Sequence, residues 1–526
     1  MDNVLERIIA SVVCATLFCL ATYKTLGAMQ QSGYKNGSFL RWLKRKDNML
    51  YNRLSVLALC IALSTAVVSL CFSFLGSRLA LILSALPFVG LWTAYIGADT
   101  KYALKVRTVA TGRVKRLFAL YFLFTLCFTY LFIALLCFLS VWNGSPLYKL
   151  ISFVPFALMG ILLPFILCLA NAVASVFENI RNGKFVKRAG QVLNESEIIR
   201  VGVVGSYGKT SVKNILKTLL SEKYSVVETP ESYNTPVGIA KTVFSEEFAG
   251  KEVFIAEMGA RKRGDIKELC DLVKPDYAVF TGVCAHHLAS FGAEEEILKE
   301  KSEIIASGAK VVCGQTLIGK VSGENVVPVC QTENVSLQDK ETSFTLVVKD
   351  KRIAVQTKLL GEAAVENIAL AATLAYTLGL TAEEIERGVQ RLDYIPHRLQ
   401  LIENGGAYIL DDGYNSNPRG AEEAVRALAR FSGGKCIVTP GIVECGTLEE
   451  EINGKLGGII AAAGIDKVIL VGDTLVGVVK AGYLAAGGDE EKLTVVKTLD
   501  EAKTELSAWV QAGDCVLFLN DLPDVY

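Results

Sequence analysis

The chain has 526 residues, of which 51% are hydrophobic, and its 54 Lys and Arg residues are balanced by 54 Asp and Glu residues. This length exceeds that of one compact domain, so we expect several domains. Basic residues prevail in residues 1–178 and acidic residues prevail in residues 179–526. The acidic C-terminal part argues against nonspecific binding of nucleic acid. The 14 cysteines include no C-x-x-C pair, so neither a disulfide framework nor a zinc site is predicted.

Five apolar runs near the N-terminus predict membrane-spanning helices. They cover residues 8–23, 54–75, 79–98, 117–142 and 150–177. Most of them reach the roughly 20 residues that a helix needs to cross a bilayer, and the weakly basic segment before the first run disfavours a cleaved signal peptide. The loops at 29–53 and 99–116 are strongly basic, so the positive-inside rule places them in the cytoplasm. We therefore expect a transmembrane region with five helices over residues 1–178, followed by a cytoplasmic part.

The remaining sequence alternates between apolar, strand-like runs and helical runs, which is typical of parallel α/β sheets. After a basic connector over residues 179–197, strands are predicted at 200–204, 253–257, 277–281 and 310–313, with a hairpin near 344–355 and a helix at 362–378. A second unit has predicted strands at 407–411, 435–439, 467–471 and 515–519. The predicted fold is therefore multi-domain: an N-terminal α-helical transmembrane bundle, a central α/β domain over residues 198–395 and a Rossmann-like C-terminal α/β domain over residues 396–526.

A glycine-rich loop follows the first of these strands and precedes a helical stretch, Val212 to Leu220. It consists of Gly205, Ser206, Tyr207, Gly208, Lys209, Thr210 and Ser211. Strand, glycine loop, Lys-Thr and helix form the order of a phosphate-binding loop: backbone N–H groups turn toward phosphate oxygens, the helix N-terminus and the lysine supply positive potential, and the hydroxyl can hold Mg²⁺. The strict pattern has a glycine where Val203 stands. A glycine turn that simply starts a helix is therefore the alternative.

Further polar residues stand where a metal-assisted phosphate site needs them. Glu257 ends the apolar strand 253–256, and an acid at the carboxyl end of a strand beside a phosphate loop is well placed to hold a metal ion. A solvated acid is the alternative. His286 and His287 follow the next strand and are two of only three histidines in the chain. Lys301, taken alone, is interpreted as a solvated lysine on a helix.

Together these motifs resemble those of the Mur ligases, ATP-dependent amide ligases of peptidoglycan precursor synthesis, and the resemblance covers roughly residues 198–526. It implies that Thr210 and Glu257 hold one Mg²⁺ ion. It also implies that His287 and a carbamylated Lys301 hold a second Mg²⁺ ion. In the family, ATP converts a carboxylate to an acyl phosphate, which an amine then attacks. The implied catalytic residues are Lys209, His287, Lys301 and Arg398.

The resemblance continues through the second α/β unit. Asn367 resembles the asparagine near the adenine, Arg398 resembles the arginine that reaches the γ-phosphate, and Asp412 would accept hydrogen bonds from the ribose hydroxyls. The segment 411–418 is close to the signature of the family member that adds D-alanyl-D-alanine to a muramoyl-tripeptide. It implies three substrate-binding residues: Tyr414, Asn415 and Asn417.

The chain departs from the family pattern at several points. Ala363 and Ala364 replace a His-Asn pair, which removes a nucleotide or domain contact, and Ala289 replaces a glutamate. Apolar runs occupy the place of the N-terminal domain that grips the UDP-sugar. We therefore expect a multi-pass protein of the bacterial cell membrane, in contact with membrane lipids, with cytoplasmic catalytic domains. Its expected substrates are ATP, a small-molecule or lipid-linked muropeptide, and a D-alanyl-D-alanine-like amine.

Two other interpretations remain open. A poly-γ-glutamate-type synthetase also resembles Mur ligases and is membrane-associated, but the segment 414–418 disfavours it. A non-catalytic membrane scaffold or transporter with a nucleotide-binding domain belongs to a different class. The apolar runs contain almost no charged residues, so they indicate no substrate path. Acceptor-dependent release of ADP distinguishes a ligase from such a scaffold.

Overall fold

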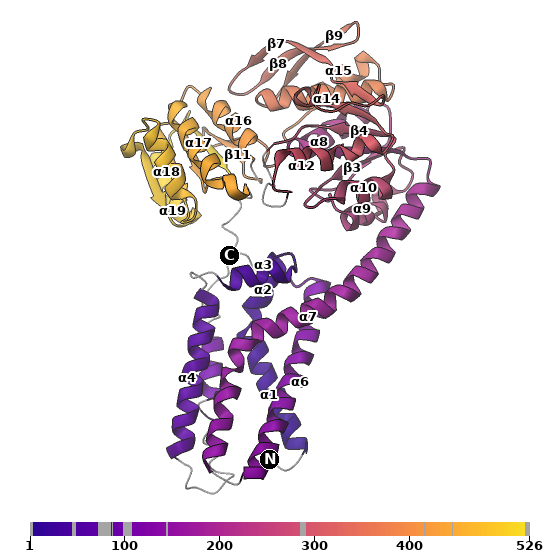
Figure 1. Ribbon diagram of the computed structural model, residues 1–526. Coiled ribbons are helices and arrows are strands. Elements are labelled where there is room, and N and C mark those ends of the chain that lie inside the picture. The colour runs from indigo at the N-terminus through magenta and orange to yellow at the C-terminus, as the bar shows by residue number, and fades with distance from the viewer. Residues whose placement is uncertain are drawn as a thin grey trace. The chain divides into compact units, whose positions relative to one another are not determined.

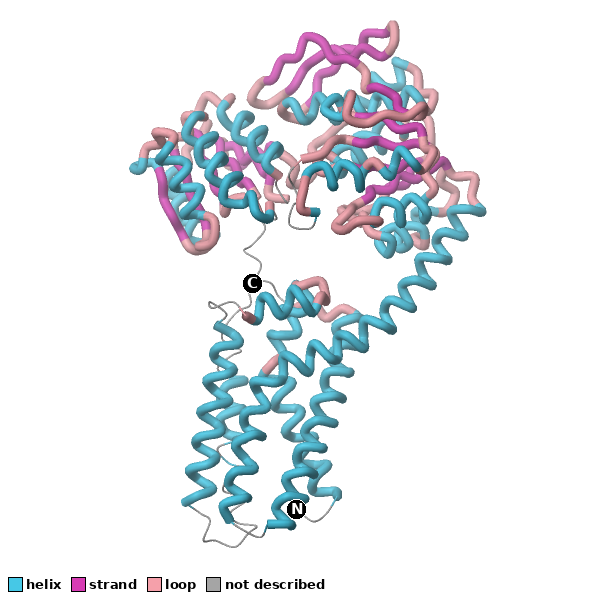
Figure 2. Tube along the Cα trace, viewed as in Figure 1, coloured by secondary structure: helices cyan, strands magenta, loops and turns pink. Residues whose placement is uncertain are grey.

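The computed structural model describes residues 4–44, 49–71, 86, 88–97, 108–143, 146–284, 291–414, 417–443 and 445–520 (Figure 1). The chain divides into two compact units, the first ending at Arg181 and the second running from Asn182 to Asp524. The fold class inferred from the sequence is confirmed, because an N-terminal helical region with apolar helices precedes two α/β domains (Figure 2).

The first unit is helical in the residues that the structure describes. Its helices are α1 (Val4–Ala21), α2 (Tyr23–Gln31), α3 (Asn36–Leu43), α4 (Met49–Cys71), α6 (Gly112–Asn143) and most of α7 (Pro146–Glu195). Within the described residues, three stretches are long and apolar enough to cross a membrane: Val4–Ala21, Gly112–Leu135 and Met159–Glu195. The apolar runs at 54–75 and 79–98 extend into residues outside the description, so the expectation of five spans stays a prediction.

The interior of the first unit combines aromatic packing with one buried amide. The rings of Phe18 and Trp92 meet edge to face with their centres 5.3 Å apart, and both side chains are fully buried. Asn171 of α7 is also buried. Its Nδ2 donates to the carbonyl of Tyr34 at 2.9 Å and to Oδ1 of Asn36 at 2.7 Å. These bonds satisfy a polar group that would be costly to bury alone, and they attach α7 to the turn between α2 and α3.

The C-terminal end of α7 belongs to the second unit. The helix continues through residues 179–195, which form most of the basic connector expected from the sequence. Ala189 and Leu193 are buried in the same apolar cluster as Leu269 and Leu272 of α10. This packing fixes the last turns of α7 against the first α/β domain.

The first α/β domain contains a six-stranded parallel sheet in the order β2-β3-β1-β4-β5-β6. Its strands are β1 (Ile199–Val204), β2 (Val226–Glu228), β3 (Val253–Met258), β4 (Tyr277–Phe280), β5 (Lys310–Cys313) and β6 (Val326–Pro328). The four predicted strands are confirmed, whereas β2 and β6 were missed because three residues carry too little periodicity. Every residue of β3 is buried, as expected for a parallel strand with both faces covered.

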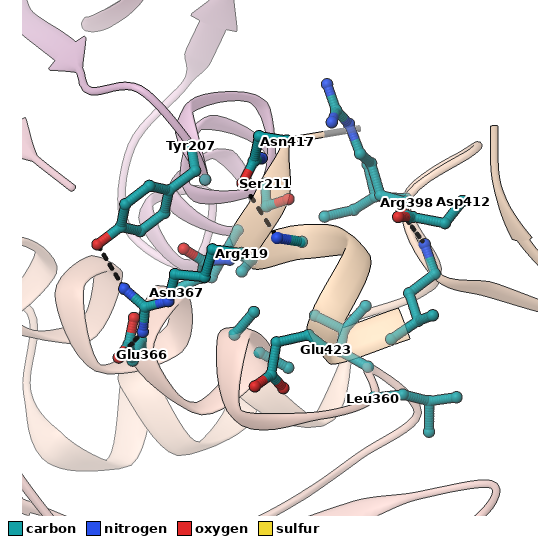
Figure 3. A pocket seen from close by; sticks show the side chains of 18 residues that line it. Tyr207, Ser211, Leu360, Glu366, Asn367, Arg398, Asp412, Asn417, Arg419 and Glu423 are labelled. Carbon is teal, nitrogen blue, oxygen red and sulfur yellow. Dashed lines mark hydrogen bonds and ion pairs between the residues drawn. The ribbon is translucent and has the colours of Figure 1, made fainter. Parts of the chain in front are cut away.

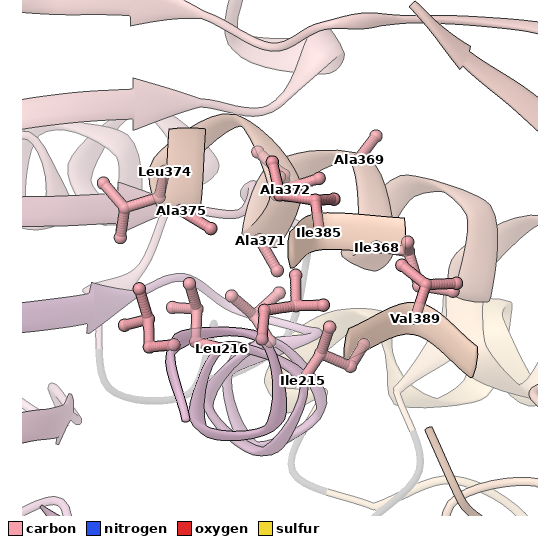
Figure 4. Close-up of a cluster of buried hydrophobic side chains, with 14 of the residues drawn as sticks. Ile215, Leu216, Ile368, Ala369, Ala371, Ala372, Leu374, Ala375, Ile385 and Val389 are labelled. Atoms are coloured by element: carbon pink, nitrogen blue, oxygen red, sulfur yellow. The ribbon is translucent and has the colours of Figure 1, made fainter. Parts of the chain in front are cut away.

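Helices cover both faces of this sheet. The helices of this domain are α8 (Lys209–Leu220), α9 (Pro236–Val243), α10 (Asp265–Val273), α12 (Glu294–Lys301), α13 (Glu303–Ala306), α14 (Glu362–Thr377) and α15 (Ala382–Gln390). Figure 4 shows Ile215 and Leu216 of α8 directed toward α14, which presents small side chains such as Ala371 and Ala372. The small residues let the two helices pack closely, and full burial of each Ile or Leu contributes about 1.5–3 kcal/mol.

A small antiparallel sheet packs against the same domain. Its strands are β7 (Gln331–Leu337), β8 (Thr342–Val348) and β9 (Lys351–Thr357), in that order. The predicted hairpin is the β8–β9 pair, which is joined by residues 349 and 350. Alternate residues of β8 are buried, which is the pattern of a strand with one face on a core.

The second α/β domain has another six-stranded sheet, in the order β10-β11-β15-β12-β13-β14. Its strands are β10 (Gln400–Asn404), β11 (Ala407–Asp412), β12 (Lys435–Thr439), β13 (Lys467–Val471), β14 (Leu493–Val496) and β15 (Cys515–Leu519). Only β10 is antiparallel to its neighbour. Its helices are α16 (Pro418–Ala429), α17 (Glu449–Ala462), α18 (Val476–Ala485) and α19 (Leu499–Trp509). The four predicted strands are confirmed, and β10 and β14 are additional.

Candidate functional site

The glycine-rich loop lies at the carboxyl end of β1, where α8 begins. Gly208 caps α8 with a φ of +72°, and a Cβ there would lie 2.7 Å from Oδ1 of Asn367. A Cβ on Gly205 would lie 1.9 Å from Oγ1 of Thr281. Both positions therefore need glycine. Ser206 Oγ is buried and has no hydrogen-bond partner among the residues that the structure describes, so this loop hydroxyl is available to donate to a bound anion.

Two lysines converge on this loop. Nζ of Lys209 and Nζ of Lys301 both donate to the carbonyl of Gly205, at 2.8 Å and 3.1 Å. Lys301 is 1% exposed, which contradicts its interpretation as a solvated lysine. Burial, reinforced by the charge of Lys209, lowers the pKa of Lys301 to about 7. Burial also lowers the pKa of Lys209. An anion bound at the loop would relieve the repulsion between the two ammonium groups.

The two residues expected to hold the first metal ion are in contact. β1 and β3 are adjacent parallel strands with Val203 opposite Glu257, so the carboxylate and the loop meet at the same edge of the sheet. Thr210 Oγ1 donates to Oε2 of Glu257 at 3.0 Å, and Asn234 Nδ2 donates to Oε1 at 3.1 Å. Hydroxyl and carboxylate oxygens are the ligands that Mg²⁺ prefers, usually together with waters and substrate phosphates. The pair therefore fits that ion.

The second expected metal site is only partly described. His287 lies in residues 285–290, outside the described ranges, and Lys301 donates to the loop carbonyl as an amine. In the described parts of the chain, no group of three or more His, Cys, Asp or Glu residues could hold a metal ion. The second ion and the carbamate thus stay predictions.

A pocket between the two α/β domains adjoins the loop (Figure 3). Its cavity volume is about 120 Å³, which is below the usual range for small-molecule sites. Apolar side chains form one part of its wall: Ile215, Leu359, Leu360, Ile395 and Leu399. Six residues predicted to bind ATP also line it: Tyr207, Gly208 and Ser211 of the loop, with Asn367, Arg398 and Asp412. An apolar slot beside a cationic loop suits a base joined to phosphates.

The remaining predicted residues of the second domain have local roles as well. Oδ1 of Asp412 accepts a hydrogen bond from the backbone N–H of Leu399 at 3.0 Å. Asn417 caps α16, because its Oδ1 accepts from the N–H of Gly420, and it lines the pocket. Asn415 lies outside the described residues.

Tyr414 connects the second domain to the first. Its hydroxyl donates to Oγ of Ser232 at 2.7 Å, and the guanidinium of Arg398 stands over its ring at 4.7 Å. Ser232 belongs to the loop after β2 that also carries Asn234. The Tyr414 segment of the second domain therefore contacts the loop of the first domain whose Asn234 donates to Glu257.

One residue that supports Glu257 was not predicted from the sequence. Lys213 of α8 is 1% exposed, and its Nζ donates to the carbonyls of Thr229 and Glu231, both at 2.6 Å. The same Nζ lies 3.8 Å from Oε2 of Glu257. Lys213 follows Thr210 by three positions and so shares its helix face, which is the signal that could have identified it.

Comparison with known proteins places both α/β domains in one family. Residues 203–375 match the Mur ligase middle domain, and residues 397–520 match the Mur ligase, glutamate ligase domain. The chain is 29% identical over 294 residues to the UDP-N-acetylmuramoyl-tripeptide–D-alanyl-D-alanine ligase of Escherichia coli, covering 52% of this chain and 64% of that one. The Bacillus subtilis enzyme of the same name is 28% identical over 287 residues, covering 52% and 62%. The chain thus spans less than two thirds of the length of these relatives.

Solved structures agree with the sequence comparison. MurF ligase from Thermotoga maritima in complex with ADP matches with a TM-score of 0.59 and 27% identity, covering 64% of this chain and 80% of that chain. MurF from Acinetobacter baumannii matches in fold with a TM-score of 0.58 and 22% identity, covering 64% and 77%. The matched part corresponds to the two α/β domains that form the pocket.

Proposed function

Because this chain belongs to the Mur ligase family, we propose that it joins D-alanyl-D-alanine to the carboxylate of a muramoyl-tripeptide at the expense of ATP. The observation that carries the proposal is the convergence at one pocket of the phosphate loop with Arg398 and Asp412 of the second domain, beside the Thr210–Glu257 pair. The names of the relatives supply the substrates.

The proposed reaction has two steps. A carboxylate oxygen of the acceptor attacks the γ-phosphorus of ATP, so that ADP leaves and an acyl phosphate forms. The amine then attacks the acyl carbon, inorganic phosphate leaves, and the amine loses a proton. Lys209 and Arg398 would neutralise the charge that develops on the transferred phosphoryl group, and the free hydroxyl of Ser206 would donate to it.

The nucleotide would be held by both domains. Backbone N–H groups of residues 205–211 would bind its phosphates, Asn367 and the apolar wall would contact the base, and Asp412 would accept from the ribose. Mg²⁺ held by Thr210 and Glu257 would neutralise phosphate charge. Because Arg398 and Asp412 come from the second domain, closure of the domains would complete the site.

We further propose the carbamylated form of Lys301. Carbon dioxide reacts only with a neutral amine, and a pKa of about 7 makes much of the Lys301 amine neutral near neutral pH. The carbamate would replace a buried cation by an anion, which together with His287 could hold a second Mg²⁺ ion. For the amine substrate, Tyr414, Asn415 and Asn417 are the proposed contacts.

The acceptor is proposed to be carried on a membrane lipid. The three apolar helices of the first unit support insertion in the bacterial cell membrane, with the domains at 198–395 and 396–526 in the cytoplasm. In that arrangement residues 1–178 would anchor the enzyme where lipid-linked muropeptides lie, and the α7 segment over residues 179–197 would connect the two parts. A UDP-linked acceptor is the other possibility within the same activity.

The test uses the full chain, purified in detergent, with ATP, Mg²⁺, D-alanyl-D-alanine and either a UDP-linked or a lipid-linked muramoyl-tripeptide. We expect ADP release that depends on both acceptor and amine, and a product with the mass of the joined peptide. ADP release that is independent of any acceptor would contradict ligase activity and favour a scaffold or transporter. Turnover with glutamate alone as the amine would indicate a poly-γ-glutamate-type synthetase. Equal turnover of the two acceptors would contradict the proposal that the acceptor is lipid-linked.

A further inference from the structure

Arg419 of the second domain contacts two elements of the first. Its Nη1 donates to the hydroxyl of Tyr207 in the phosphate loop at 2.5 Å, and its Nη2 pairs with Oε1 of Glu366 in α14, also at 2.5 Å. The guanidinium stands over the Tyr207 ring, 4.7 Å from its centre. Figure 3 shows the three side chains in one row along the pocket, joined by these two interactions.

The position of Arg419 in its own helix is electrostatically unfavourable. Asn417 caps α16 and Pro418 is its first residue, so Arg419 lies in the first turn. The N-terminus of a helix carries partial positive charge, which disfavours a cation there. Burial also opposes its charge, but Glu366, Tyr207 and Glu423 more than offset burial and raise the pKa of Arg419. Its two hydrogen-bonded partners therefore come from the other domain, whereas Glu423 of its own helix contributes at longer range.

The partners of Arg419 adjoin the nucleotide pocket. Glu366 precedes Asn367, whose Oδ1 packs against Gly208, and Tyr207 precedes Gly208 directly. Ala363, one turn before Glu366 on α14, also lines the pocket but offers only a methyl group. Glu362, in the first turn of α14, also adjoins the second domain, because its backbone N–H donates to Oε2 of Glu423 at 3.2 Å.

Tyr207 is itself held in place. Its hydroxyl lies 3.1 Å from Oγ1 of Thr316, which follows β5, and a Cβ on Gly282 would lie 2.0 Å from that hydroxyl. The ring therefore fits closely over the Gly282 backbone. Tyr207 belongs to the phosphate loop, so the hydrogen bond that Arg419 donates to its hydroxyl links the second domain to that loop.

We propose that Arg419 is a positioning residue that holds the second domain closed over the pocket and, through Tyr207, couples this closure to the phosphate loop. This inference rests on the proposed function, because the ligand enclosed would be the adenine nucleotide. Arg419 does not need to touch the reacting atoms. This guanidinium and its two partners would contribute to both closure and loop order, beside the Tyr414–Ser232 and Glu362–Glu423 contacts.

The test compares Arg419→Ala, Glu366→Ala and Tyr207→Phe with the exchanged pair Arg419→Glu/Glu366→Arg, all in the full chain. Arg352→Ala is the matched control, because Arg352 pairs with Glu333 inside the first domain, at the surface of the small sheet. Amide hydrogen exchange is measured without nucleotide at residues 205–209 and 417–421. Binding of MgADP is measured by calorimetry, and kcat and KM for ATP are determined for each variant.

We expect Arg419→Ala and Glu366→Ala to speed exchange at both segments and to weaken MgADP binding about five- to twentyfold, in the range of a coupling between two sites. Tyr207→Phe should affect the loop segment more than α16, and the exchanged pair should recover most of the loss. Arg352→Ala should match the wild type. Unchanged exchange at strands β3 and β12 serves as the measure that each variant is folded.

Wild-type exchange and wild-type affinity in Arg419→Ala would overturn the proposal. So would an exchanged pair as defective as the single variants, because an electrostatic clamp must accept reversed charges. Failure of the proposed function looks different: the wild type itself would then bind no adenine nucleotide, while the exchange comparison without nucleotide would still report on the clamp.

Discussion

Lys209 and Lys301 donate hydrogen bonds to one carbonyl oxygen, that of Gly205, although they lie on different helices and 92 positions separate them in the sequence. Burial lowers the pKa of both ammonium groups, and the charge of Lys209 lowers the pKa of Lys301 further. The phosphate loop is therefore prepared for an anion before any ligand arrives.

Lys301→Ala should lose ligase activity, and formate or acetate should partly restore it. The reason is that a small carboxylate can enter the vacated space and replace the carbamate as a metal ligand. Turnover is measured with and without the added acid, and mass spectrometry of the intact chain under bicarbonate checks for the carbamate itself. Near-normal turnover of the variant without added acid would remove Lys301 from the mechanism.

The stability of the protein should rise with pH between about 7 and 10.5 because of Lys301. Its pKa falls from 10.5 to about 7 on folding, so in this window the unfolded chain binds one more proton than the folded chain. The free energy of unfolding then rises with pH by at most about 1.4 kcal/mol per unit. Below about pH 7, Lys301 is protonated in both the folded and the unfolded chain, so the full free-energy cost of burying its charge lowers the stability.

Lys301→Met tests this pH dependence, since it keeps the length of the side chain without its charge. We expect the thermal midpoint of the variant to exceed that of the wild type most at pH 7 and below, and the difference to shrink toward pH 10. A difference that is constant over this range would mean that the Lys301 pKa is not lowered in the folded protein.

Arg398→Ala should slow phosphoryl transfer about 10³-fold or more, because about 4 kcal/mol of charge stabilisation is lost. Single-turnover formation of ADP is the appropriate measurement, since it isolates the chemical step. Arg398→Lys, which keeps the charge, should retain part of the rate. A normal single-turnover rate in Arg398→Ala would show that the guanidinium over Tyr414 serves another purpose.

Lys213→Met should destabilise the protein by about 2–4 kcal/mol, because the carbonyls of Thr229 and Glu231 would lose a buried, charged donor. Lys217→Ala is the matched control: Lys217 lies one turn further along α8 and pairs with Glu228 near the surface. Its loss should cost less than about 1 kcal/mol. Denaturant titration compares the two, and equal effects would contradict the supporting role of Lys213.

Gly208→Ala should abolish nucleotide binding, because its left-handed φ and the 2.7 Å approach to Asn367 leave no room for a methyl group. Gly454→Ala is the contrasting change. Gly454 lies inside α17 with open space at its Cβ position, so alanine there should stabilise the helix by up to about 1 kcal/mol. Binding of MgADP and thermal midpoints together distinguish the two glycines.

The sequence alone was sufficient for the local features of this protein. The phosphate loop, the acid at the end of β3 and most strands depend on short patterns, because residue spacing and backbone propensity act over one or two turns of chain. The Thr210–Glu257 contact could be anticipated too, since parallel neighbouring strands end at the same edge of a sheet.

Other features depended on which elements pack together in space. Lys301 lies in a highly charged helix, and nothing in its neighbourhood along the chain predicts that it is buried against the phosphate loop. Lys213 beneath Glu257 and Arg419 against Glu366 likewise depend on contacts between distant segments. These contacts form only when the two domains fold and pack. The burial and the electrostatic environment of each side chain then depend on neighbours in space, which the order of residues does not identify.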